Sequence, residues 1–423
     1  MYFADHHQVD GDARNVSRTA SPLRFGLVGV NVLFLGLTSL FTDISSEMVA
    51  SVLPLYLTYE LRWSALYFGL FDGLYQGMAV LLRLTGGVIA DRHHRYKEVA
   101  GIGYALSTSC KLGLLVVQGM WLPTTMCLFL DRLGKGIRTA PRDTLIALSS
   151  PPSRRAEAFG VHRAFDSAGA LLGPLLAFGL LGLFPEDFHG IFAVSFGVGL
   201  LGLATLVLLV DNRLPASPQK AVLATRTWLS MLNLLWIPSF RRLLLAAAAL
   251  SVLSISDAFV YLTFQRVSDL PMSFFPLLYL GTALIYLILA IPLGLLADLI
   301  GRWRVFLAGY SGLLGVYAIL LIPRLELFAL LTCLILLGTY YAASDGVLSA
   351  MASELLPPIQ LTSGLALLTT VIILARLVAS VIYGALWSWQ GPRLTLSLFI
   401  AGLAASMLCA ALMLPRQPEA APE

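Results

Sequence analysis

The stretch GVIADRHHRYK at residues 87–97 recurs in altered form as GLLADLIGRWR at residues 294–304. Both copies contain Gly-x-x-x-Asp followed by basic residues, and the second copy begins 207 residues after the first. A Pro-Pro pair at residues 151–152 recurs at residues 357–358, at nearly the same interval. Because two unrelated patterns repeat at one interval, the chain is predicted to consist of two similar halves.

The composition excludes an ordinary soluble protein. Of the 423 residues, 58% are hydrophobic and only 12% are charged, and the mean hydropathy is +0.81. A soluble domain contains about 25% charged residues, so a cytosolic enzyme is excluded and a membrane protein is predicted. The net charge of +4 does not indicate nucleic-acid binding, because most Lys and Arg lie in a few short loops. The four cysteines lie in apolar segments without zinc-like spacing, so no disulfide, metal or cofactor is expected.

Twelve apolar segments are long enough for transmembrane helices, each of which needs about 20 residues. We therefore predict an all-α polytopic membrane protein with two six-helix bundles. The segments cover approximately residues 25–58, 65–90, 98–119, 122–148, 157–183, 189–210, 243–266, 273–297, 304–323, 326–355, 361–389 and 392–414. The expected divisions are a tail at 1–24, a first bundle at 25–210, a central loop at 211–242, a second bundle at 243–414 and a tail at 415–423.

The distribution of Lys and Arg predicts which side of the membrane each loop faces. The polar first 24 residues lack the cleavage site of a signal peptide and are predicted to be a cytoplasmic tail. With twelve spans, sixteen Lys and Arg of the loops and tails lie on the cytoplasmic side and four on the other side. This positive-inside bias predicts that both termini are cytoplasmic.

Sixteen charged residues are left at membrane depth once the loops are assigned. Each would cost about 2.5 to 3.5 kcal/mol if it faced lipid, so they are expected to face one another or a hydrated cavity. The bases are Arg83, Lys111, Arg132, Lys135, Arg138, Arg142, Arg163 and Arg376. The acids are Asp43, Glu47, Asp72, Asp131, Asp143, Asp166, Asp257 and Asp345.

Two interpretations of these charges stay open. Asp131 is close enough to Lys135 along one helix to pair with it and to serve packing alone. The same holds for Arg163 and Asp166. Arg138 has no acid three or four residues away, so its partner is either an acid on a neighbouring helix or an anionic substrate. The substrate hypothesis is favoured by the asymmetry between the halves, since seven of the eight bases precede the central loop.

Three motifs resemble those of the major facilitator superfamily of secondary transporters, and the resemblance extends over essentially the whole chain. Residues 87–97 resemble the signature between the second and third helices, in which Asp and Arg pair across the cytoplasmic seam. Arg132-x-x-Lys135-Gly136 resembles the fourth-helix signature, whose Arg is associated with proton transfer. Gly169-x-x-x-Gly173-Pro174 resembles the fifth-helix antiporter signature. The longer stretch DRLGKGIRTAPRD at residues 131–143 resembles a bacterial subgroup of this superfamily.

The resemblance implies two bundles that enclose a central cavity and alternate between inward-open and outward-open states. No Gly-x-x-x-x-Gly-Lys-Ser/Thr motif for nucleotide binding is present, so the expected energy source is an ion gradient and no enzymatic activity is expected. The predicted function is proton-coupled export of a small solute by an efflux antiporter in the bacterial inner membrane. Alternatives are proton-coupled uptake of an anionic nutrient or metal-chelate, and a transporter-like sensor or assembly factor. The expected partners are this solute, protons and the lipid bilayer, without nucleic acid, and we expect a monomer.

The predicted site consists of a substrate and proton pathway and of a gate. Proton coupling is assigned first to Asp43 and Glu47, which lie one helical turn apart, with Arg132 as modulator. The full pathway is Asp43, Glu47, Asp72, Lys111, Arg132, Lys135, Arg138, Asp166, Asp257, Asp345 and Arg376. The gate, which is expected to latch the cytoplasmic ends of the two bundles, is Gly87, Asp91, Arg92, Arg95, Gly294, Asp298 and Arg302.

Overall fold

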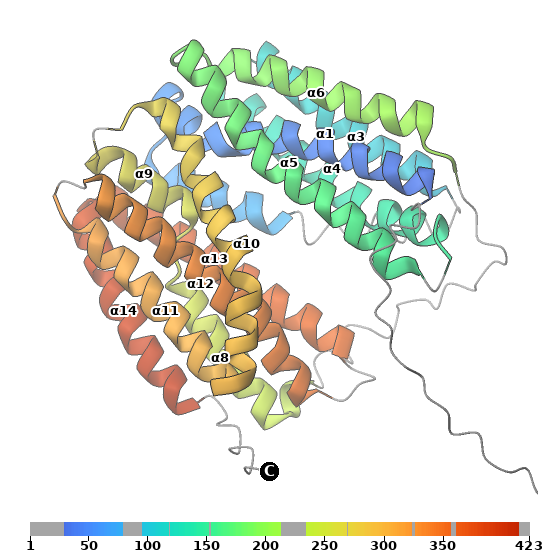
Figure 1. The fold of residues 1–423 in the computed structure, drawn as a ribbon. Coiled ribbons are helices and arrows are strands. Elements are labelled where there is room, and N and C mark those ends of the chain that lie inside the picture. The colour runs from blue at the N-terminus through green and yellow to red at the C-terminus, as the bar shows by residue number, and fades with distance from the viewer. Residues whose placement is uncertain are drawn as a thin grey trace, which may run out of the picture.

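The structure is a computed structural model that describes residues 29–78, 95–117, 119–151, 154–212, 234–268, 270–323, 326–356 and 361–413. Within these ranges the regular elements are all helices (Figure 1). Ten helical segments are long and apolar enough to cross a membrane. A bilayer favours this fold because an α-helix satisfies its backbone hydrogen bonds internally.

The first half of the chain forms one bundle. α1 packs against α5 and α6, and α3 packs against α4 and α6. α4 is longer than α3 and nearly as long as α5, but it carries six charged residues among its 28, which gives this bundle its polar character. The elements are α1 (Val30–Leu55) with its π-helical extension η1 (Tyr56–Glu60), a helix whose described part is residues 65–78, α3 (Tyr96–Val116), α4 (Trp121–Leu148), α5 (Arg155–Leu183) and α6 (Phe188–Leu209).

The second half forms a bundle of its own, so the predicted all-α architecture of twelve transmembrane helices in two bundles is confirmed. α12 packs against α10 and α11, and α8 packs against α13 and α14. The elements are η4 (Leu234–Trp236), α8 (Pro238–Val252), α9 (Asp257–Val267), η5 (Met272–Phe274), α10 (Phe275–Ile300), α11 (Arg302–Leu320), α12 (Leu327–Leu355), α13 (Leu361–Gln390) and α14 (Pro392–Met413).

One span differs from its predicted form. The segment at 243–266 was expected to be a single helix, but it contains two, α8 and α9, with a break at residues 253–256. The hydroxyl of Tyr317 on α11 accepts a hydrogen bond from the Ile255 backbone N–H at 2.7 Å and donates one to the Leu253 carbonyl at 3.3 Å. These bonds satisfy backbone groups that the interrupted helix leaves without helical partners.

The two bundles meet at one end of the molecule and diverge toward the other (Figure 1). The helix at residues 65–78 lies so close to α13 that a Cβ atom on Gly384 would be 2.4 Å from the Ala65 carbonyl oxygen. A Cβ atom on Gly69 would be 2.3 Å from the Ser380 carbonyl oxygen. We call this contact the glycine seam. A second contact between the bundles joins α5 to η5 and α10.

The glycine seam should not tolerate a side chain. Gly384→Ala is expected to lower, several-fold, the cross-linking of cysteines placed at Leu66 and Ser388, where the Leu66 N–H bonds to Ser388 Oγ at 3.0 Å. The measurement is thiol cross-linking in a background without native cysteines. Gly182→Ala is the control, because a Cβ there meets nothing within 4 Å. Equal yields in the two variants would contradict the close contact.

Candidate functional site

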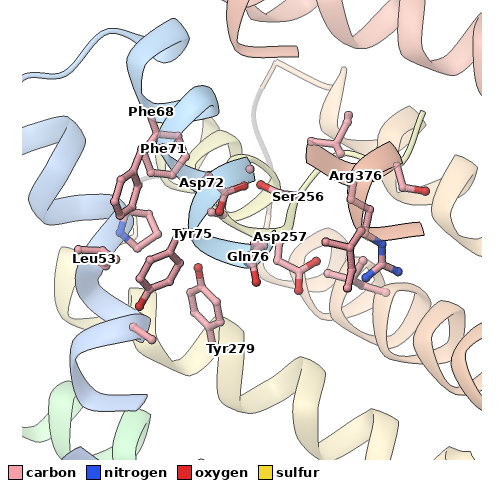
Figure 2. A pocket seen from close by; sticks show the side chains of 18 of the residues that line it. Leu53, Phe68, Phe71, Asp72, Tyr75, Gln76, Ser256, Asp257, Tyr279 and Arg376 are labelled. Carbon is pink, nitrogen blue, oxygen red and sulfur yellow. The ribbon is translucent and has the colours of Figure 1, made fainter. Parts of the chain in front are cut away.

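A cavity of about 410 Å³ lies between the bundles and receives side chains from both (Figure 2). Its aromatic wall lies close to the glycine seam: Phe68 packs edge-on against Phe259 with ring centroids 5.0 Å apart. Phe71 stacks on Tyr75 with centroids 5.2 Å apart. The polar lining consists of Glu47, Asp72, Tyr75, Gln76 and Arg132 from the first half and Ser254, Ser256, Asp257, Tyr279, Tyr340, Tyr341 and Arg376 from the second.

α1 and α4 face each other through three polar contacts, spaced about one helical turn apart. The contacts are Glu47 Oε1 to Lys135 Nζ at 3.8 Å, Asp43 Oδ1 to Arg138 Nη2 at 3.6 Å, and Ser39 Oγ to Arg142 Nη1 at 3.1 Å. Residue numbers rise along α1 as they fall along α4, so the helices run antiparallel. We call these contacts the α1–α4 ladder. Of its members, Glu47 also lines the cavity.

The fifth-helix glycines have a definite role in this arrangement. A Cβ atom on Gly169 would lie 2.9 Å from the Asp43 Cβ, and one on Gly173 would lie 2.7 Å from the Glu47 Cβ. Larger residues at these positions would push α5 away from α1. The glycine pattern therefore lets α5 pack directly behind the two acids of the α1–α4 ladder.

Arg138 has an internal partner. Its side chain is only 3% exposed, lies 3.6 Å from Asp43 and packs over the Tyr104 ring at 4.5 Å. The acid on a neighbouring helix, one of the two partners considered for it, is thus Asp43. Arg138 also lies outside the lining of the cavity, so it no longer supports an anionic substrate.

Neither of the pairs considered along a single helix forms. Asp131 binds Lys111 on α3 at 2.7 Å, together with the Ser107 hydroxyl, whereas Lys135 turns to Glu47. Both Lys111 and Asp131 are buried. Because neither lines the cavity, this pair joins α3 to α4 as part of the packing.

On α5, Asp166 lies near two bases other than the one considered from the sequence. It is 3.5 Å from His162 and 3.9 Å from Arg142, and no ion pair with Arg163 is present among the described residues. The Arg163 side chain is exposed. Asp166 is thus a neighbour of the α1–α4 ladder and does not line the cavity.

Arg132 lines the cavity but contacts neither Asp43 nor Glu47 through an ion pair. Its Nη2 donates a hydrogen bond to the Tyr75 hydroxyl, and its guanidinium carbon lies 4.0 Å from the centre of the same ring. Asp131 Oδ2 is 4.0 Å from its Nε. Tyr75 therefore holds Arg132 against the cavity wall, a role that the sequence did not indicate.

The second bundle contributes a smaller group of charges. Asp257, the first residue of α9 after the helix break, accepts a hydrogen bond from the Tyr341 hydroxyl at 2.6 Å. One turn beyond Tyr341, Asp345 lies 4.0 Å from Arg376 Nη2 on α13. The side chains of Asp345 and Arg376 are 53% and 38% exposed, so this pair is more accessible than the Lys111–Asp131 pair.

Asp72 connects the cavity to the glycine seam. Ser380 on α13 donates a hydrogen bond to Asp72 Oδ2 at 2.8 Å, so the bond joins the two bundles. Asp72 is only 6% exposed. Sequence reasoning missed Ser380, since a neutral hydroxyl in an apolar helix carries no recognisable signal until its partner is known.

The predicted gate is only partly within the described residues. Arg302 binds Asp298 at 2.8 Å and Glu354 at 2.6 Å, both in its own bundle. Glu354 was not anticipated. Arg95 is exposed immediately before α3, and a Cβ on Gly294 would meet nothing within 4 Å. Gly87, Asp91 and Arg92 lie outside the described residues.

Comparison with known proteins identifies the family. The sequence matches the Major Facilitator Superfamily over residues 35–324. The chain belongs to this superfamily. It is 32% identical over 371 residues to an uncharacterized MFS-type transporter of Methanocaldococcus jannaschii, covering 86% of this chain and 90% of that protein. A shorter match, 33% identical over 122 residues, is to the multidrug resistance protein MdtH of an Enterobacter species and covers 29% of this chain and 30% of that protein.

Solved structures of superfamily transporters share the fold. The nucleoside transporter NupG aligns with a TM-score of 0.77 at 13% identity, over 91% of this chain and 100% of that one. A peptide transporter of the POT type aligns with a TM-score of 0.72 at 16% identity, over 90% and 93%. The chain is thus a multi-pass membrane protein of a transporter superfamily.

Proposed function

We propose that the protein is a secondary active transporter that exports a small solute in exchange for protons by alternating access. The observation that carries this proposal is a charged cavity between two bundles that are joined at one end and diverge at the other. With the topology that the Lys and Arg distribution predicts, the diverging ends face the cytoplasm. The structure then represents an inward-open state, and transport requires the glycine seam to open as the cytoplasmic ends close.

Proton coupling is assigned to Glu47 in preference to Asp43. Glu47 lines the cavity, its side chain is 31% exposed, and Lys135 is 3.8 Å away. Asp43 lies outside the cavity lining and pairs with the buried Arg138. A proton arriving through the cavity therefore reaches Glu47 before it reaches Asp43. Protonation of Glu47 would release Lys135 from the α1–α4 ladder.

Export is the proposed direction for two reasons. The fifth-helix glycines resemble the antiporter signature and pack against the acids of the α1–α4 ladder. The partial similarity to MdtH, a multidrug resistance protein, also favours efflux. We also propose that Asp298 and Arg302 act as a gate. They are bonded to each other within one bundle in this structure and would meet Asp91 and Arg92 when the cytoplasmic ends close.

A proteoliposome assay tests this function. If the protein exchanges solute for protons, the solute should accumulate inside vesicles whose lumen is more acidic than the medium, because each solute that enters is coupled to protons that leave. A panel of radiolabelled cationic, anionic and neutral solutes is screened under both gradient directions, with protein-free vesicles as control. Accumulation in vesicles with an alkaline lumen would indicate uptake by symport instead. No response of any solute to either gradient would contradict proton coupling.

A further inference from the structure

Each base that lines the cavity has an acid within 4.0 Å, whereas two of the acids have no Lys or Arg of the described residues that close. Arg132 lies beside Asp131, and Arg376 lies beside Asp345, each at 4.0 Å. The third acid of the lining, Glu47, has Lys135. In the part of the chain that the structure describes, neither Asp72 nor Asp257 lies within 4.0 Å of a Lys or Arg. Their hydrogen bonds come from the hydroxyls of Ser380 and Tyr341.

These two carboxylates belong to opposite bundles and face the same cavity (Figure 2). An uncompensated carboxylate at membrane depth is costly, and hydroxyl donors offset only part of that cost. A positive charge placed between Asp72 and Asp257 would satisfy both. The lining contains three carboxylates, Glu47, Asp72 and Asp257, and two guanidinium groups, Arg132 and Arg376, so its acids outnumber its bases. It is complementary to a cation and not to the anion suggested by the surplus of bases in the first half.

The aromatic side chains indicate which kind of cation fits. Phe68, Phe71, Tyr75 and Tyr279 line the same space, and the face of an aromatic ring attracts cations. The Arg132 guanidinium, 4.0 Å from the centre of the Tyr75 ring, already shows this contact within the cavity. A metal ion would need a set of several oxygen ligands, and the described residues contain no group of three or more His, Cys, Asp or Glu that could hold one.

We propose that the cavity binds a monovalent organic cation with an apolar portion, such as a protonated or quaternary amine, between Asp72 and Asp257. The inference rests on the proposed function and names its substrate class. The volume of about 410 Å³ suits a small organic molecule. Because Asp72 also accepts a bond from Ser380 across the glycine seam, a cation at this site contacts both bundles and the contact that joins them.

The test compares two probes of similar size and opposite charge, benzyltrimethylammonium and phenylacetate, by calorimetry on the purified full chain in detergent. The cation should bind, and phenylacetate should not. Asp257→Asn and Asp72→Asn should each weaken cation binding about tenfold or more, since each leaves one carboxylate for the ligand. Asp257→Glu should restore part of the affinity. Asp187→Asn is the control for the same chemical change, because Asp187 caps α6 away from the cavity.

A second variant pair covers the case in which the Asn variants fail to fold. Tyr279→Ala should weaken cation binding several-fold, while Tyr279→Phe, which keeps the ring, should not. Tighter binding of phenylacetate than of the cation, or cation binding unaffected by both Asn variants, would overturn the inference. Equal effects of Tyr279→Ala and Tyr279→Phe would also overturn it. Transport of an anion under a pH gradient, with no cation binding, would refute the cation site and leave the proposed function standing.

Discussion

Replacing Glu47 by Gln should abolish accumulation driven by a pH gradient while leaving exchange of labelled for unlabelled solute measurable. Glutamine keeps the size and polarity of the side chain but cannot take up or release a proton. Gradient-driven transport needs that proton in each cycle. Solute exchange needs only that the solute-loaded cavity open to one side and then to the other. The measurement is the ratio of the two rates in proteoliposomes, which should fall by at least about tenfold.

The control is Glu157→Gln, which makes the same chemical change at the exposed start of α5, where the acid contacts Arg154. It should leave both rates near those of the native protein. If Glu47→Gln accumulates solute with an unchanged pH profile, the proton site lies elsewhere. Asp43 or a cavity carboxylate of the second bundle would then be the next candidate.

Replacing Lys111 by Met should be the most destabilising single change within the charged network. Lys111 and Asp131 are 2.7 Å apart, with side chains 4% and 12% exposed. Removing the lysine breaks this buried pair and leaves Arg132, at 4.0 Å, as the nearest base of Asp131. Breaking a buried ion pair costs about 3 to 5 kcal/mol. We expect a marked loss of folded protein, measured as the thermal midpoint in detergent and the monodisperse yield after extraction.

Two further variants separate this effect from a general loss of charge. Lys135→Met removes a base whose side chain is 33% exposed and 3.8 Å from its acid, so its cost should be much smaller. The double change Lys111→Met with Asp131→Asn should recover much of the lost stability, because the buried carboxylate is removed together with the base that binds it. Equal destabilisation by Lys111→Met and Lys135→Met would contradict the assigned difference in burial.

The helix break at 253–256 illustrates a limit of prediction from hydropathy. The segment around it is apolar on average, although it contains Ser251, Ser254, Ser256 and Asp257, so its hydropathy predicts one uninterrupted span. The group that stabilises the break is the hydroxyl of Tyr317, which lies on another helix and far along the chain. A local pattern cannot reveal such a partner, and the break matters because it places Asp257 at the start of α9 beside the cavity.

The partners of the charges show the same limit. Spacing along a helix indicated that Asp131 could bind Lys135, but Lys111 on α3 is closer, and Lys135 instead faces Glu47 on α1. Spacing defines only which side chains share a face of one helix. The distance between neighbouring helices decides which of them meet. Between α3 and α4 this distance is set by Gly103 and Gly134, where an added Cβ atom would lie 2.7 Å and 2.6 Å from the carbonyl oxygen of the other glycine.

The sequence by itself determined the helical class, the two halves and the presence of charged residues at membrane depth. These properties follow from apolar runs, an internal repeat and the cost of placing charge in lipid, all of which are properties of composition and order. Only the tertiary structure decided that Arg138 pairs with Asp43, and that Asp72 and Asp257 face one cavity with no Lys or Arg of the described residues within 4.0 Å of either. The physical reason is that charge compensation depends on distances between helices, which packing sets and sequence spacing does not.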